Sequence, residues 1–466
     1  MIRLLAARFV VLLLVGLSSP PAWAATTHLI LPDGTGDFPD IRSAIVASAS
    51  GDTLVLGDGT FTGPDNRSLS FLGRSLVVRS LSGSLACVID CENAAGGFRI
   101  QGDGITITRG YAETTGGGAI LCQGPIGPVI RNCRFVSNRA VGCGPAGGAI
   151  RITGCAMKIY DCLFEDNNSA GFGGGIACHQ EANVELLSCT FLGNAATEGG
   201  AVEVRGSTLT LTECLLIRNE AYIAGAASAW DSSTFTVRRC TLAENMASGD
   251  VSEICVPGGS GSGPVRVFVE HSILANGNSR AIFCGNFGAF DVACSDIYGH
   301  PNGNWTGCTK DLLGVDGNIC EDPLFCDEAN DDFTIRSDSP CGPDHDPECG
   351  LIGALPVGCY APAGAPAIIE PAALALRVAG ANPARGEARI VYSIPPALAG
   401  SPVTITVHDA TGRLVRRLFE GNVAGDTGLL AWDGRSGAGA RAPWGIYFFR
   451  IVAGSASATE QIVLLE

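Results

Sequence analysis

Five side chains able to act as acids, bases or hydrogen-bonding groups recur through the middle of the chain: Arg151, His179, Glu203, Arg205 and Asp231. An acid, a cation and an imidazole on one rigid surface can bind a sugar chain, or abstract a proton if a neighbour tunes a pKa. The same residues would equally form an ordinary solvated face with ion pairs such as that of Glu203 with Arg151. The catalytic residues are therefore unknown. Glu203, Arg205 and Asp231 are candidates for catalysis, and all five form a candidate binding face.

The elements that must position these side chains belong to a repeat. Its apolar marker follows a cysteine, and the steps between successive markers are 29, 27, 25 and 26 residues at Phe135, Phe164, Phe191, Leu216 and Leu242. Repeats of this length, built from short strands and Gly/Asn turns, predict a parallel β-helix in which each repeat is one coil. Roughly eleven coils, each rising about 4.8 Å, would form a rod on the order of 50 Å long.

Short alternating runs such as "AVEVRG" and "LTLTEC" are the predicted strands. Alternation turns Cys189 and Phe191 inward and Ser188 and Thr190 outward. By the same rule the five candidate site residues point outward. We therefore expect them on one exposed strand face, in consecutive coils.

Two kinds of residue predict the corners of each coil. An asparagine follows every apolar marker by three residues, and because asparagine tolerates a left-handed backbone and stacks its amides, we expect a structural ladder. The members of this ladder are Asn138, Asn167, Asn194, Asn219 and Asn245. A Gly-Gly-Ala triplet turns the next corner, where a larger side chain would collide with the adjacent coil. The segment between asparagine and triplet varies in length, so it carries the loops.

The first 24 residues resemble an export signal. Arg3 and Arg8 lie at the start of the apolar run "FVVLLLVGL", and "AWA" at 22–24 fits an A-x-A cleavage site. We expect residues 1–24 to be a signal peptide and the exported protein to reach the extracellular space or the outer cell surface, with a retained anchor as the alternative. No later segment approaches the about 20 apolar residues of a transmembrane helix.

Charge excludes one class of partner. Without residues 1–24 the chain keeps 28 basic and 46 acidic residues, a net charge of −18. This charge argues against nucleic acid, whose phosphates require a basic surface. No cofactor is required by any motif, although Ca²⁺ remains an option because carboxylate oxygens bind it. The candidate calcium ligands are Asp331, Asp332, Asp344 and Asp346. A solvated acidic loop is the alternative.

Cysteine is unusually abundant, with 20 residues, all before Ala361. In an exported protein some of them should form disulfides. Cys122 and Cys133, Cys178 and Cys189, and Cys284 and Cys294 are separated by 11, 11 and 10 residues. Each pair could close across its own coil. The alternative is two columns of buried thiols. Six further cysteines from Cys308 to Cys359 predict a disulfide-stapled end cap.

Several motifs resemble known families. The pairing of "FxxN" with "GGA[ILV]" between Gly117 and Asn245 resembles the repeats of chlamydial polymorphic outer-membrane proteins, which implies a β-helical surface adhesin. "LPDGTGDFPDIRSAIVASASGDTLVLGDGTF" looks like the N-terminal cap of the pectin-lyase-like superfamily, in which Ile41, Ala44 and Ile45 would lie on one face of a plugging helix. Asp322–Cys341 resembles the final coils of right-handed β-helix proteins.

After Tyr360 the composition changes. "APAGAPAIIEPAA" is a Pro/Ala linker, assigned to 360–372, and residues 373–466 contain short strands and no cysteine. This last region reads as a β-sandwich of about seven strands. It resembles the FlgD-like Ig fold and the C-terminal sorting modules of secreted bacterial proteins. The resemblance is carried by Asp409, Gly412, Leu414, Trp432, Asp433, Gly434, Gly445, Tyr447 and Phe449.

The predicted fold class is therefore all-β: a right-handed parallel β-helix over 25–359, with its cap helix and Cys-rich end, followed by a small Ig-like β-sandwich. The pectin-lyase-like resemblance implies that an enzyme must be considered. The "NTD", "GHG", "YQDT" and "LGRPW" motifs of its enzymes are absent. We therefore expect a binding, adhesive or structural role toward a glycan or other cell-surface ligand. The alternative is a polysaccharide lyase or glycoside hydrolase acting on acidic polysaccharide along the strand face.

Overall fold

The computed structural model describes residues 25–466 except 97–101, 104, 114–115, 125, 143–145, 258–262, 286–287, 361–373, 380–383, 386–387, 396–397, 399–400, 423–426, 455 and 466. The expected signal peptide and all but the first residue of the expected linker lie outside the described residues. The chain divides into two compact units, Met1–Cys320 and Glu321–Glu466. The segment 321–359, assigned to the β-helix from sequence, thus falls in the second unit.

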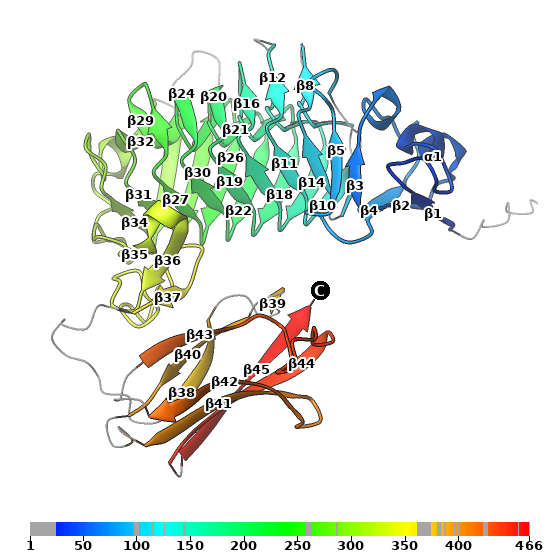
Figure 1. Cartoon of the computed structure of the whole chain (residues 1–466). Helices are drawn as coiled ribbons and strands as arrows, with labels where there is room; N and C mark the ends of the chain where they lie inside the picture. The colour runs from blue at the N-terminus through cyan, green and yellow to red at the C-terminus, as the bar shows by residue number, and fades with distance from the viewer. Residues whose placement is uncertain are drawn as a thin grey trace, which may run out of the picture. The chain divides into compact units, whose positions relative to one another are not determined.

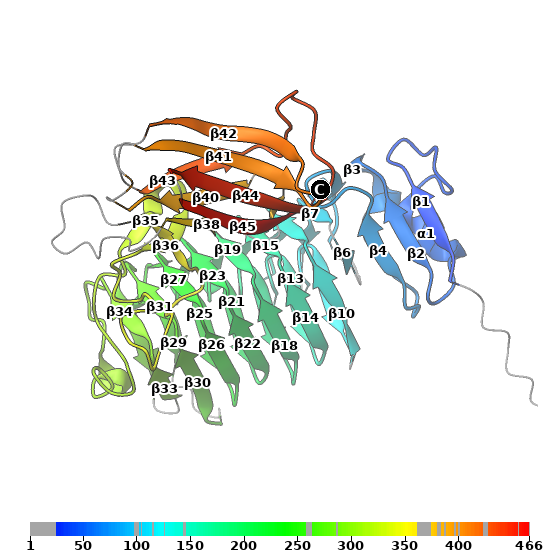
Figure 2. The same ribbon diagram turned by 90° about the horizontal axis from the view of Figure 1, so that it is seen from below.

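The first unit is a parallel β-solenoid in which each full coil contributes one strand to each of four sheets, in the order A, B, D and C (Figures 1 and 2). Sheet A contains β1 (Thr27–Ile30), β2 (Thr53–Leu56), β4 (Val77–Ser80), β6 (Gly102–Asp103), β10 (Ile126–Arg131), β14 (Ala156–Tyr160), β18 (Asn183–Leu187), β22 (Thr208–Thr212), β26 (Thr234–Arg238), β30 (Val265–Glu270) and β33 (Gly288–Ala293). Sheet B contains β3 (Gly59–Phe61), β5 (Cys87–Asp90), β7 (Thr106–Thr108), β11 (Arg134–Val136), β15 (Leu163–Glu165), β19 (Thr190–Leu192), β23 (Leu215–Ile217), β27 (Thr241–Ala243), β31 (Ile273–Ala275) and β34 (Asp296–Tyr298).

The other two sheets begin several coils later. Sheet C contains β9 (Ile120–Gln123), β13 (Ile150–Thr153), β17 (Ile176–His179), β21 (Val202–Arg205), β25 (Ala227–Trp230), β29 (Val251–Val256) and β32 (Arg280–Cys284). Sheet D contains β8 (Tyr111–Ala112), β12 (Arg139–Ala140), β16 (Asn168–Ser169), β20 (Ala195–Glu198), β24 (Glu220–Ile223) and β28 (Met246–Ala247). The 11 strands of sheet A agree with the coil number expected from the repeat length.

The repeat places its apolar markers in one interior column, as predicted. Phe135 pairs in register with Phe164, and Phe164 with Phe191. Their rings stack with centroids 4.9 and 4.6 Å apart. Leu216 and Leu242 continue the column in the next two coils. Positions about 27 residues apart in the chain are therefore neighbours across one coil spacing.

The five asparagines of the repeat form a continuous hydrogen-bonded ladder with no exposed surface. The Nδ2 of Asn167 donates to Oδ1 of Asn194 at 2.8 Å and also to the backbone carbonyl of Phe135 at 2.9 Å. Asn194 repeats this arrangement with Asn219 and Phe164, both at 2.9 Å. The buried side-chain amides thus satisfy one another and the backbone at the corner of each coil.

The ladder ends on an acid. Asn245 Nδ2 donates to Glu253 Oε2 at 2.8 Å, and Glu253 Oε1 lies 3.4 Å from His300 Nε2. The coil after Asn245 has Gly277 at the asparagine position, and a Cβ there would lie 2.7 Å from Glu253 Oε1. The Glu253 side chain therefore fills the place of a missing ladder amide. Burial raises the pKa of Glu253, although His300 and Asn245 act in the opposite direction.

Glycine is required at the second position of the triplet. A Cβ added to Gly174 would lie 2.2 Å from the carbonyl oxygen of Gly200 in the next coil, and one added to Gly200 would lie 2.2 Å from that of Gly225. Real Cβ atoms do not approach backbone so closely. This confirms that the triplet marks a corner where coils touch backbone to backbone.

A short helix closes the N-terminal end. α1 (Ile41–Ala47) is capped by Asp40, whose side chain accepts from the backbone N–H of Ser43 at 2.7 Å. Ile41, Ala44 and Ile45 are buried in the solenoid core, as the expected plug requires. The 3₁₀ turns η1 (Pro64–Asn66) and η2 (Gly307–Thr309) lie in loops of the same unit.

The cysteine pairs expected from spacing are wrong. Cys122 in β9 forms a disulfide with Cys155 in the turn between β13 and β14, and Cys284 forms one with Cys308. Cys178 and Cys189 are buried free thiols. Cys122 bonds to the adjacent coil instead, because β9 pairs with β13 and Cys155 lies just beyond β13. The thiol-column alternative holds for Cys133, Cys162, Cys189, Cys214 and Cys240.

In the second unit a small sheet contains β35 (Phe325–Asp327), β36 (Asp332–Arg336) and β37 (Val357–Cys359), and Cys326 bonds to Cys359. β35 and β36 are antiparallel. Whereas β36 and β37 are parallel, the β35–β36 pair departs from the parallel coils that the resemblance implied. The cause is η3 (Glu328–Asn330), which ends at a left-handed Asp331 and reverses the chain.

The calcium candidates occupy this region without converging. Asp332 Oδ1 accepts from the backbone N–H of Thr334 at 3.1 Å, and Asp346 Oδ1 accepts from that of Glu348 at 2.9 Å. These two carboxylates therefore bond to the local backbone two residues further along the chain. Over the part of the chain that the structure describes, no three His, Cys, Asp or Glu side chains are grouped to hold a metal ion.

The remainder of the second unit forms two packed sheets. One contains β38 (Ala375–Ala379), β40 (Ala388–Ser393) and β43 (Thr427–Trp432), and the other β39 (Ala384–Arg385), β45 (Ala456–Leu465), β44 (Gly445–Ala453), β41 (Pro402–Asp409) and β42 (Leu414–Asn422). Trp432 is fully buried between them, with its ring 4.9 Å from that of Tyr447 and 5.9 Å from that of Phe449. Three of the residues that carry the Ig-like resemblance, Trp432, Tyr447 and Phe449, thus lie in its core, whereas Leu414 is exposed.

Candidate functional site

The outer face of sheet C holds four of the five predicted site residues in two register rows. Arg151, Ala177 and Glu203 form one row across β13, β17 and β21, and His179 and Arg205 share the other. Asp231 directly follows β25. Strand alternation therefore brought these residues onto one face.

The expectation that this face is exposed is wrong for three of them. The relative exposed area is 6 % for Arg151, 5 % for His179 and 0 % for Glu203. Only the Arg205 and Asp231 side chains reach solvent substantially, at 29 % and 43 %. Side chains from between sheet D and the triplet contribute to this burial, since Phe172 lies beside His179 and Glu198 lies beside Arg205.

Three covering or flanking residues were not identified from sequence. The ring of Phe172 lies 6.0 Å from that of His179, and Arg205 stacks between Phe172 and Trp230, with its guanidinium 4.8 and 4.9 Å from the two ring centroids. Glu198 Oε2 lies 3.5 Å from Arg205. The sequence marked Phe172 and Glu198 only indirectly, through their place in the variable segment between the asparagine and the triplet.

Next to Phe172 and Trp230, the charged side chains form a connected network. Glu203 Oε2 lies 2.6 Å from His179 Nε2, and Glu203 Oε1 accepts from Arg205 Nε at 3.1 Å. Arg205 also lies 3.8 Å from Asp231. Burial raises the pKa of Glu198, while Arg205 acts to lower it. Burial lowers the pKa of Arg151, against the attraction of Glu203.

This network is arranged for mutual neutralisation. A general base must come within hydrogen-bonding reach of the proton it removes. Glu203 has no exposed surface, and its two oxygens face His179 and Arg205. Removing one partner of a buried ion pair leaves the other charge uncompensated. The network therefore stabilises the packing of the side chains over sheet C.

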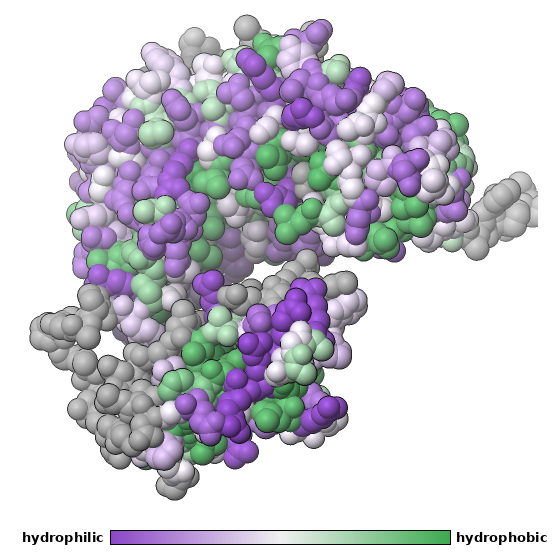
Figure 3. All heavy atoms as spheres, in the orientation of Figure 1, coloured by the Kyte–Doolittle hydropathy of each residue, from purple (hydrophilic) through white to green (hydrophobic). Residues whose placement is uncertain are grey.

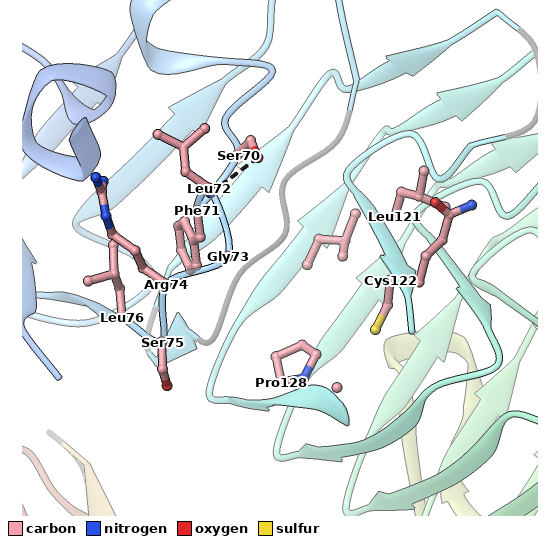
Figure 4. Close-up of a pocket in the computed structure, with 13 residues that line it drawn as sticks. Ser70, Phe71, Leu72, Gly73, Arg74, Ser75, Leu76, Leu121, Cys122 and Pro128 are labelled. Carbon is pink, nitrogen blue, oxygen red and sulfur yellow. Dashed lines mark hydrogen bonds between the residues drawn. The ribbon is translucent and has the colours of Figure 1, made fainter. Parts of the chain in front are cut away.

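The structure also contains two hollows that the sequence did not indicate. The first, of about 460 Å³, lies between Ser70–Leu76 and the strands β9 and β10 (Figure 4). Its only charged described lining residue is Arg74, and Cys122 on its far side is held in a disulfide. This lining offers no acid, histidine or free thiol for catalysis.

The second hollow, of about 390 Å³, lies on the solvent face of sheet D across β16, β20 and β24. We call it the sheet D hollow, and its polar lining includes Asn168, Thr197, Glu220, Tyr222 and Ser248. The visible solenoid surface is largely hydrophilic with scattered apolar residues (Figure 3). The sheet D hollow is therefore one local concave feature on a mixed surface.

Comparisons with known proteins agree with the two halves of the fold. A family model described as a right handed beta helix region matches residues 66–196 and 144–297, and one described as an FlgD Ig-like domain matches residues 382–457. The solenoid is accordingly right-handed. The pectin-lyase-like and outer-membrane-protein-like resemblances are not supported by either match.

No curated protein matches the chain. A solved structure that it resembles is PorZ, an essential bacterial surface component of the type-IX secretion system of human oral-microbiomic Porphyromonas gingivalis. The likeness is 19 % in identity, with a TM-score of 0.14, and covers 20 % of this chain and 11 % of that one. A similarity of this extent transfers neither fold nor function.

None of the helices in the described part of the chain has the length and apolar character needed to cross a bilayer. The disulfides are compatible with an exported protein, because such bonds persist in oxidising compartments.

Proposed function

We propose that this right-handed β-helix with an FlgD Ig-like domain is an exported surface protein that binds glycans without cleaving them. The observation that supports this proposal is the burial of Glu203 between His179 and Arg205. The acid and the imidazole considered as candidates for acting on a substrate are buried and pack against each other. We therefore assign glycan binding to other parts of the solenoid surface.

The C-terminal Ig-like domain is proposed to sort or anchor the exported chain, and residues 1–24 to direct export. The disulfides support an extracellular location, because such bonds persist in oxidising compartments. Cell fractionation and protease treatment of intact cells test this part. Material found wholly inside the cell would contradict it.

A polysaccharide lyase or hydrolase is the second candidate, favoured by one observation. Arg205 and Asp231 reach solvent at the edge of the network, and Glu198 beside them has a raised pKa through burial. Perturbed pKa values in partly open sites accompany acid–base catalysis.

One experiment separates the two candidates. The purified chain, without residues 1–24, is incubated with neutral and acidic polysaccharides, with and without Ca²⁺, and assayed for unsaturated products and new reducing ends. We expect retention of a glycan and no cleavage. Cleavage that disappears in Arg205→Ala and Glu203→Gln, but persists in Glu185→Gln, an exposed acid paired with Lys158, would overturn the binding-only proposal.

A further inference from the structure

The sheet D hollow is the feature of the solenoid surface best suited to hold a ligand. We infer that it binds the neutral sugar residues of a glycan, an inference that rests on the proposed function and assigns its site. The hollow arises from residue size. Ala195 lies in register between Asn168 and Glu220, so one small side chain separates two longer ones on adjacent strands.

The polar groups around the hollow are available for a ligand. Asn168, Glu220, Tyr222 and Ser248 are exposed, and their side chains make no hydrogen bond to any described residue. This contrasts with the outer face of sheet C, where Glu203 and Arg205 satisfy one another. Thr197 is already used, since its hydroxyl donates to the carbonyl of Ala170 at 2.9 Å.

The chemistry of these groups matches a polyol. Glu220 supplies acceptors, while Asn168, Tyr222 and Ser248 supply both donors and acceptors. Sugar hydroxyls likewise donate and accept. Tyr222 is 61 % exposed. An exposed phenol ring offers an apolar face and a polar tip in one residue, which suits the alternating apolar and hydroxylated surfaces of a sugar.

Charge selects a neutral ligand over an acidic one. The carboxylate of Glu220 is the sole charged group among the described lining residues of the hollow, and no basic side chain lines it. Arg139 occupies the same register row one strand beyond Asn168, outside the lining. The net charge of −16 adds long-range repulsion toward polyanions. Neutral hexose chains meet neither penalty.

The test uses the full exported chain on an array of neutral and uronic-acid oligosaccharides, followed by calorimetry with the best neutral ligand. We expect neutral glycans to be retained and Tyr222→Ala and Asn168→Ala each to weaken binding about tenfold, the change that corresponds to one lost contact of about 1.4 kcal/mol. Glu220→Gln should weaken binding less and should lower the discrimination against acidic glycans.

Two matched variants serve as controls. Met246→Ala removes an exposed side chain of the same sheet outside the lining, and Glu181→Gln removes an exposed carboxylate elsewhere on the solenoid. Both should bind like the unchanged chain. Folding of each variant is checked by circular dichroism, so that loss of binding is not loss of structure.

The outcomes distinguish this inference from the proposed function. If the chain binds a glycan and the Tyr222 and Asn168 variants bind equally well, the hollow is the wrong site while the binding role stands. Preference for acidic glycans would also overturn the inference. If the chain binds no glycan on the array, both the inference and the glycan part of the proposed function fail.

Discussion

Asn194→Ala should remove the centre of the buried ladder and destabilise the solenoid strongly. The Asn194 side chain makes four hydrogen bonds. It donates to Phe164 O and Asn219 Oδ1, both at 2.9 Å, and accepts from the backbone N–H and Nδ2 of Asn167 at 3.1 and 2.8 Å. All four lie in a position without exposed surface.

The magnitude follows from these bonds. A buried hydrogen bond contributes about 1 kcal/mol net, and a buried group left without a partner costs about 1–3 kcal/mol. After the substitution the backbone N–H of Asn167 loses the acceptor it uses, whereas Asn167 Nδ2 keeps its bond to Phe135. We therefore expect a loss of about 4 kcal/mol in the free energy of unfolding of the solenoid.

The assay must resolve individual coils, because a chain with two compact units does not unfold as one two-state system. Hydrogen exchange measured by mass spectrometry on peptides from 160 to 225 provides this resolution. Protection should fall in the coils on both sides of Asn194, since repeats are coupled mainly to their neighbours. The control is Asn168→Ala, an exposed asparagine outside the ladder. A loss under about 1 kcal/mol, or equal loss in both variants, would refute the ladder as a source of stability.

Three further predictions concern the same unit. Gly200→Ala should cost several kcal/mol or prevent folding, because its Cβ would meet Gly225 O at 2.2 Å. Gly124→Ala meets no atom within 4 Å and should cost only about 1–3 kcal/mol of backbone strain at its φ of +108°. Similar urea midpoints for the two variants would contradict this. The folded-state pKa of Glu253 lies above its usual 4.5, so the native state binds the extra proton and stability should fall as pH rises from 4.5 through the raised pKa. The Glu253→Gln variant should lack that decline. If the urea midpoints of the variant and the unchanged chain change with pH in parallel, the decline does not come from Glu253. Burial raises the pKa of Cys87 to about 12, and the thiols of Cys133 and Cys162 are buried, so maleimide should label these residues only after unfolding; rapid labelling of the native chain would disprove their enclosure.

The sequence determined the parts of the fold that depend on periodicity. Because a strand alternates its side chains and a solenoid stacks equivalent positions, the spacing of Phe135, Phe164 and Phe191 was enough to predict an interior column. The Gly-Gly-Ala corner followed from the same logic, since only glycine fits where Gly174 meets the carbonyl of Gly200. The comparisons and the structure agree on the right-handed β-helix and the Ig-like domain.

Only the tertiary structure decided burial and pairing. Alternation gives the direction of the Glu203 side chain but cannot show that it is buried, with Phe172 and Glu198 packed beside its partners His179 and Arg205. Cysteine spacing along the chain likewise could not show that Cys122 reaches Cys155, because that bond depends on how β9 and the turn after β13 meet in space. The sheet D hollow depends on lateral register between strands, which brings Asn168, Ala195 and Glu220 side by side. Periodic positions are local properties of a chain, whereas exposure and contact between loops arise when distant segments pack.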